Sequence, residues 1–84
     1  MNRYLVLVMR TPRFDAALIG PHRDFIARLR AEAKLELSGG FGDGSGGAYL
    51  LRVDSLDTAR AIAAEDPLIV HGSSLATVYE WNAA

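Results

Sequence analysis

The chain has 84 residues, of which 50% are hydrophobic and 23% charged, the balance of one small globular domain. Its net charge is −1 with acids and bases interspersed, so we expect neither a nucleic-acid partner nor an anionic membrane surface. Cysteine is absent, which excludes disulfides, thiolate chemistry and cysteine-ligated metal centres. The N-terminal apolar run is too short to cross a bilayer and has no signal-peptide cleavage site, so we expect a cytoplasmic protein.

The first half of the chain predicts a strand, a helix and a second strand. Residues 4–9 are apolar at every position, which is typical of a central strand covered on both faces. Residues 14–19 predict a preliminary helical turn. Residues 21–33 predict the main helix, because Pro21 suits a first helical position and apolar residues then recur at helical spacing. Residues 34–38 alternate between polar and apolar side chains, which predicts an edge strand with one wet face.

The second half predicts a glycine-dense hairpin loop at 39–47, a strand at 48–53, a helix from 56 to about 66, a short irregular segment or single turn at 68–72 and an alternating last strand at 75–81. Asp54 and Ser55 offer N-caps for the helix, and Pro67 is expected to stop it. The strand before this helix is apolar on both faces apart from Arg52, so we expect it to be central as well.

The predicted order βαββαβ is that of a ferredoxin-like α+β fold with a four-stranded antiparallel sheet, forming a single domain over residues 1–84. Right-handed crossovers place the first and third strands in the centre and the second and fourth at the edges. Two helices cover only one face of such a sheet, whereas the central strands are apolar on both faces. We therefore predict a homodimer in which the uncovered sheet faces pack together.

This topology brings polar residues from distant parts of the chain to one rim of the sheet. His22 begins the first helix there on its apolar side, the glycine loop carries Asp43, and the second helix ends there at Asp66. An imidazole that a carboxylate orients can act as general base or acid near neutral pH. His22 and Asp66 are therefore the candidate catalytic residues, and Asp43 is the other carboxylate that can pair with the imidazole. The alternative is structural, with His22 buried at a helix start and Asp66 closing a helix before Pro67.

Four further residues near this rim are candidates for binding a small-molecule ligand. Arg23 is next to His22 and can hold an anionic substrate. Phe41, on the glycine loop, can line a pocket. Asp43 and Ser45 lie on the same loop, whose glycines let the backbone approach a ligand closely.

Three other sequence features suggest functional sites, but each lacks a part that the corresponding site requires. The G-x-G-x-x-G match at residues 42–47 leads into a strand, so it lacks the helix N-terminus that dinucleotide binding requires. A metal site built from His22 and His71 with an aspartate of the rim has no compact ligand spacing. Ser45 lacks the elbow motif of a serine nucleophile. We therefore expect neither a metal nor a cofactor.

The chain resembles the YCII-related (YciI-like) family over nearly its whole length. The resemblance rests on the order and spacing of short motifs, namely Tyr4-Leu5-Val6-Leu7-Val8, His22-Arg23-Asp24-Phe25, Leu35-Glu36-Leu37-Ser38-Gly39-Gly40-Phe41, Asp43-Gly44 with Gly46-Gly47, Ala59, and Glu65-Asp66-Pro67-Leu68 followed by Gly72. The chain departs from the usual pattern at Gly40, where proline is common, and at Ala33-Lys34, where a glycine often ends the helix.

The resemblance implies the dimeric α+β barrel arrangement and a pocket whose proposed active site is a His–Asp pair, matching His22 and Asp66 here. One branch of the family resembles a dehydrochlorinase acting on a chlorinated hydroxyquinol, and related barrels include metal-free monooxygenases and isomerases. We therefore predict a small cofactor-free enzyme of lyase or isomerase type that moves a proton on a small cyclic or phenolic substrate. The alternative is a non-catalytic small-ligand-binding or accessory module.

Overall fold

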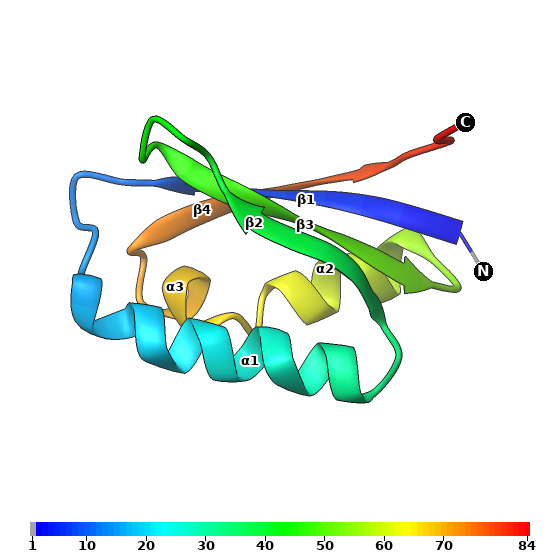
Figure 1. Cartoon of the computed structure of the whole chain (residues 1–84), viewed down its shortest axis with the longest axis horizontal. Coiled ribbons are helices and arrows are strands. Elements are labelled where there is room, and N and C mark those ends of the chain that lie inside the picture. Colours follow the sequence, from blue (N-terminus) through cyan, green and yellow to red (C-terminus); the bar gives the residue numbers. More distant parts are fainter. Residues whose placement is uncertain (1) are drawn as a thin grey trace.

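A four-stranded antiparallel sheet is the frame of the structure (Figure 1). The computed structural model describes residues 2–84, which form β1 (Asn2–Arg10), η1 (Ala16–Leu18), α1 (Ile19–Ala31), β2 (Leu35–Gly40), β3 (Gly46–Val53), α2 (Leu56–Ala63), α3 (Pro67–Val70) and β4 (Ser74–Glu80). The order across the sheet is β2-β3-β1-β4, so the two strands that are apolar on both faces lie in the centre. The predicted ferredoxin-like α+β fold is confirmed.

The helices cover one face of this sheet, and the core lies between the two layers (Figure 1). Tyr4, Val6 and Val8 of β1 point to this side and are at most 5% exposed. From α1, Phe25 and Leu29 join the same buried cluster. Burial of each such side chain contributes about 1.5–3 kcal/mol. The core therefore fixes α1 on the sheet, and with it the polar residues at its first turn.

The other face of the sheet carries no helix among residues 2–84 (Figure 1). The strand register assigns its side chains, because Leu5 opposes both Leu50 of β3 and Tyr79 of β4 and so shares their side. We call this surface the open face; its large apolar members are Leu5, Leu7, Met9, Leu37, Leu50, Leu75, Tyr79 and Trp81. Five of them keep 37–67% of their surface exposed. Such a patch is typical of an interaction surface.

Four of the six glycines of the glycine-dense stretch lie in strands, which shortens the loop predicted for residues 39–47. β2 continues to Gly40 and β3 begins at Gly46, so the connecting loop comprises only residues 41–45. Gly46 has a φ of 156°, and a Cβ built there would collide with the Val8 carbonyl oxygen of β1. The prediction failed because glycine allows close backbone packing inside a sheet as well as loop flexibility.

A β-bulge at Glu36 breaks the alternation predicted for β2. Leu35 opposes Leu51, whereas Leu37, two residues later, opposes Leu50, only one residue away on β3. Leu35 is therefore buried on the helix side, and Leu37 is 65% exposed on the open face. The predicted single wet face was wrong because each face of β2 receives one leucine.

The C-terminus of α1 holds one residue in a left-handed conformation. α1 begins and ends two residues before the predicted helix at 21–33. Beyond its end, Ala33 has a φ of 60°, and the Lys34 N–H donates to the Leu29 carbonyl at 3.0 Å, as in a Schellman motif. In the sequence pattern that this chain resembles, a glycine often ends the helix at this point. Alanine is strained there because its Cβ crowds the backbone.

Replacing Ala33 with glycine should therefore raise the free energy of unfolding by about 1 kcal/mol. Urea denaturation followed by circular dichroism measures the change. The matched control is Ala31→Gly, because Ala31 is exposed and still helical, and glycine there should lower the free energy of unfolding by about 0.5–1 kcal/mol. Equal effects of the two substitutions would contradict the strain at Ala33.

Candidate active site

A cavity of about 480 Å³ lies between α1 and the helix-side surface of the sheet. Ile19, His22 and Ile26 line it from α1. Tyr49 of β3 and a strip of glycine backbone from β2 and β3 line it from the sheet. A volume of this size is within the range of small-molecule sites, and its walls are mainly apolar with a few polar groups. The cavity is therefore the candidate site for binding a small molecule.

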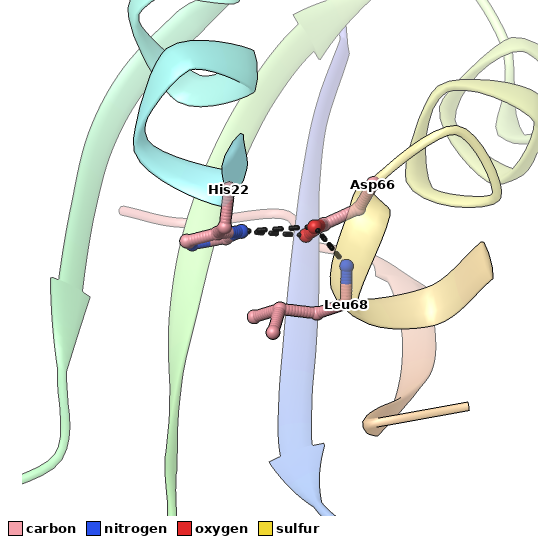
Figure 2. A network of polar contacts seen from close by, with 3 residues as sticks. All are labelled: His22, Asp66 and Leu68. Atoms are coloured by element: carbon pink, nitrogen blue, oxygen red, sulfur yellow. Dashed lines mark hydrogen bonds and ion pairs between the residues drawn. The ribbon is translucent and has the colours of Figure 1, made fainter. Parts of the chain in front are cut away.

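His22 is held in the wall of this cavity by Asp66 (Figure 2). The imidazole Nδ1 lies 2.9 Å from each carboxylate oxygen of Asp66. Figure 2 shows the imidazole reaching from the first turn of α1 towards the carboxylate at the start of α3. The Asp66 side chain is fully buried, whereas 23% of the His22 side chain is exposed. The structure thus pairs His22 with Asp66 and not with Asp43.

Asp66 also caps the short helix α3, which fixes its orientation. Its Oδ1 accepts a hydrogen bond from the Leu68 N–H at 3.0 Å, and Pro67 occupies the first helical position (Figure 2). α2 has already ended at Ala63, three residues before the end predicted from Pro67. The Asp-Pro pair therefore begins a new helical turn, and the cap holds the carboxylate towards α1.

This contact determines which nitrogen of His22 is left free to act as a base. An ionised carboxylate only accepts hydrogen bonds, so the contact with Asp66 places the proton of a neutral imidazole on Nδ1. Nε2 then carries the lone pair, and no group among residues 2–84 hydrogen-bonds to it. A buried carboxylate behind the ring and a free lone pair in front of it is the arrangement of a general base.

The other predicted ligand-binding residues fall into two groups. Arg23 lines the cavity beside His22. Phe41, Asp43 and Ser45 are outside the cavity wall, in a loop that rises on the side of the sheet away from α1 (Figure 1). There the Ser45 N–H donates to Asp43 Oδ1 at 2.9 Å, and hydrogen bonds from the Ser45 side chain and backbone lower the pKa of Asp43 below its ordinary value. Contact of these three residues with a ligand stays a prediction.

Two buried hydroxyl groups of the cavity wall were not predicted from the sequence. Tyr49 is 3% exposed and Ser74 is 1% exposed, and neither hydroxyl has a hydrogen-bond partner among residues 2–84. Burial, together with the charge of Asp66, raises the pKa of Tyr49, so its phenol keeps its proton and can donate. The sequence could have indicated Tyr49 by its position. It shares one face of its strand with Leu51 and Val53, which face the helices, and it is the residue of that row with a polar group.

Two arginines of the cavity wall were also missed. Arg30 is eight residues after His22, with Ile26 midway, so the three share one side of α1. Arg10 continues the helix-side row of β1 beyond Val8. Both spacings are readable in the sequence, but arginines among interspersed charges are more often part of a solvated surface.

The described residues hold no group of three or more His, Asp and Glu side chains arranged to bind a metal ion. Within the same part of the chain, 2–84, no helix is both long and apolar enough to span a membrane.

Comparison with known proteins identifies the family. The family model of the YCII-related domain matches residues 2–82. The chain belongs to the YCII-related family. Its relatives include the uncharacterized protein YjpA of Bacillus subtilis (strain 168), which is 44% identical over 82 residues that cover 98% of this chain and 96% of that protein.

A solved structure with the same fold is that of 5-chloro-2-hydroxyhydroquinone dehydrochlorinase (TftG) from Burkholderia phenoliruptrix AC1100, in complex with 2,5-dihydroxybenzoquinone. It matches this YCII-related chain with a TM-score of 0.70 over 98% of this chain and 95% of that one. The two sequences are 20% identical, so the likeness establishes the fold.

Proposed function

We propose that this YCII-related chain is a small enzyme of lyase or isomerase type that uses His22 as a general base. The observation that carries the proposal is the position of His22, which lines a cavity while a fully buried carboxylate holds its other nitrogen. A structural histidine sealed in the core would have both nitrogens bonded to protein.

The proposed reaction needs only a proton shuttle. The Nε2 lone pair removes a proton from the bound ligand, and the negative charge of Asp66 stabilises the imidazolium that forms. The imidazolium then returns the proton to another position of the ligand, or to a leaving group as it departs. Both outcomes are redox-neutral, and the chain's own residues supply every group that the step requires.

The size of the cavity favours a substrate built on a single ring, cyclic or phenolic. The structural neighbour TftG, a dehydrochlorinase solved with 2,5-dihydroxybenzoquinone, supports this choice because it places such chemistry on the same fold. We further propose that the chain acts as a homodimer joined through the open face, because its exposed leucines, Tyr79 and Trp81 need a cover that the helices do not supply.

The test is a comparison of His22→Asn with His71→Asn, since His71 is exposed and outside the cavity. Both variants are incubated with phenolic and quinonoid ring compounds, including 5-chloro-2-hydroxyhydroquinone, and conversion is followed by chloride release and by ring-proton NMR in deuterated water. His22→Asn should lower the rate by about 10²–10⁴-fold without loss of fold or ligand binding, and His71→Asn should leave the rate unchanged. Binding without conversion in the unaltered protein would favour the non-catalytic module, and equal rates in both variants would remove His22 from catalysis.

A further inference from the structure

The cavity is surrounded by positive charge that no carboxylate neutralises. Arg10, Arg23 and Arg30 all line it, and none of them has a carboxylate oxygen within 4 Å among residues 2–84. By contrast, Arg3 and Arg52, at the other end of the sheet, share Glu36. Three arginines without a carboxylate partner therefore gather around one cavity, although the net charge of the chain is −1.

Two of these arginines contact uncharged side chains. Arg10 stacks over the Phe14 ring at 4.1 Å from its centroid, and Arg30 donates to the Ser38 hydroxyl at 3.5 Å. No aspartate or glutamate lines the cavity. Asp66 lies behind His22, fully buried, and its oxygens are occupied by the imidazole and the Leu68 N–H. The cavity therefore presents hydrogen-bond donors and positive charge to whatever enters it.

The two unpartnered hydroxyls are an independent observation that points to a ligand. Buried polar atoms are nearly always hydrogen-bonded, because an unmade bond costs stability. Tyr49 and Ser74 break this rule in the wall of the same cavity. Tyr49 retains its phenolic proton, as its raised pKa requires. Each hydroxyl oxygen has less than 1 Å² of accessible surface, so a ligand oxygen would satisfy it after a small movement of the cavity wall.

We propose that this cavity selects small organic anions, namely single-ring compounds that carry a carboxylate or phenolate oxygen. The anionic oxygen pairs with Arg23 and Arg30 at the edge of α1, and a second ligand oxygen accepts from the hydroxyl of Tyr49 or from that of Ser74. The ring then lies against Nε2 of His22. The inference rests on the proposed function only for the choice of site, since anion selection requires no turnover.

Benzoate and benzamide are the probes, because they share size and shape but only benzoate is charged. Binding is followed by ¹H–¹⁵N NMR titration of the full-length protein. Benzoate should bind at least about tenfold more tightly than benzamide at low salt, and added salt should reduce this preference. Arg23→Gln and Arg30→Gln should each remove most of the preference. Arg28→Gln is the matched control, because Arg28 is on the same helix but lies over the Phe25 ring, outside the cavity.

A second variant tests the hydroxyls. Tyr49→Phe should weaken benzoate binding several-fold and raise the midpoint of thermal unfolding by a few degrees, because it removes a buried group without a partner. The control is Tyr4→Phe, whose buried hydroxyl accepts a hydrogen bond from Asn2 outside the cavity. It should not weaken benzoate binding.

Several outcomes would overturn the proposal: no binding of either probe up to its solubility limit, equal affinities for the two, or a loss of preference no larger in Arg23→Gln and Arg30→Gln than in Arg28→Gln. The result is separable from the fate of the proposed function. Benzoate selection in a protein whose His22→Asn variant shows no catalytic defect would keep the anion site and reject the enzyme. A catalytic defect in His22→Asn, in a protein that does not prefer benzoate to benzamide, would keep the enzyme and reject the anion site.

Discussion

Replacing Asp66 with asparagine should move the proton of neutral His22 from Nδ1 to Nε2 while the fold is retained. The amide oxygen still accepts the Leu68 N–H and caps α3. The amide NH₂ that replaces Oδ2 faces Nδ1, now 2.9 Å from Oδ2, and can only donate. The amide oxygen at the Oδ1 position is also 2.9 Å from Nδ1, but it already accepts the Leu68 N–H, so the facing NH₂ favours Nδ1 as the acceptor. In that tautomer Nε2 carries the proton and lacks the lone pair that a base requires. Long-range ¹H–¹⁵N NMR of the imidazole ring identifies the tautomer directly, without a substrate.

The proposed reaction should slow in this variant by about 10²–10⁴-fold, because the general base is lost. Asp66→Ala is the companion variant. It removes both the cap and the imidazole partner from a fully buried position, and should lower the free energy of unfolding by about 2–4 kcal/mol. The exposed His71 is an internal reference in the spectra of both variants. An unchanged Nδ1–H tautomer in Asp66→Asn would contradict the predicted tautomer change and its effect on the proposed base.

Replacing Leu7 with glutamate should convert a dimer into a monomer. Leu7 lies on central strand β1 and opposes Ala48 and Thr77 across the open face. In the proposed dimer a charge there is buried without a partner, which costs several kcal/mol and weakens association by at least about 100-fold. Size-exclusion chromatography with light scattering should report twice the 9.1 kDa chain mass for the unaltered protein and a single chain mass for the variant.

Ala61→Glu is the control for this substitution. Ala61 is exposed on α2, on the covered side of the sheet, so the same added charge should leave the dimer intact. Circular dichroism should show that both variants keep the fold, since neither changes the cluster between the sheet and the helices. A monomeric unaltered protein at micromolar concentration would refute the dimer, and a dimeric Leu7→Glu variant would move the interface elsewhere.

Periodicity and topology were sufficient to predict the fold and to place His22 and Asp66 at the same rim of the sheet. The unbroken apolar run of β1 identified a central strand, and the βαββαβ order placed the start of α1 and the end of the second helical region at one rim. The sequence left Asp43 and Asp66 as alternative partners of His22, because topology predicts at which rim of the sheet a residue lies but not which side chains make contact. The local choice depended on the cap of α3, which turns Asp66 towards α1.

Features that depend on packing between strands were not predictable. The bulge at Glu36 arises from pairing with β3, and nothing in the local pattern of β2 marks it. Gly39, Gly40, Gly46 and Gly47, which the sequence suggested as loop, are strand, because close backbone approach depends on the pairing of two strands and not on one segment alone. The sequence identified Tyr49 as part of an apolar strand. That its hydroxyl lacks a hydrogen-bond partner depends on the surrounding side chains and is visible only in the structure.

The glycine strip on the cavity wall and the His22–Asp66 pair lie on different elements. The shape of the cavity can therefore change without moving the proposed catalytic pair. A Cβ at Gly40, which lines the cavity, would meet only the Gly46 carbonyl oxygen, at an ordinary 3.8 Å. A larger residue there reshapes the chamber without displacing a core side chain, while the imidazole and its carboxylate stay on α1 and α3. Substitution at this one edge-strand position should therefore change which compounds the cavity accepts and leave the proposed proton transfer by His22 in place.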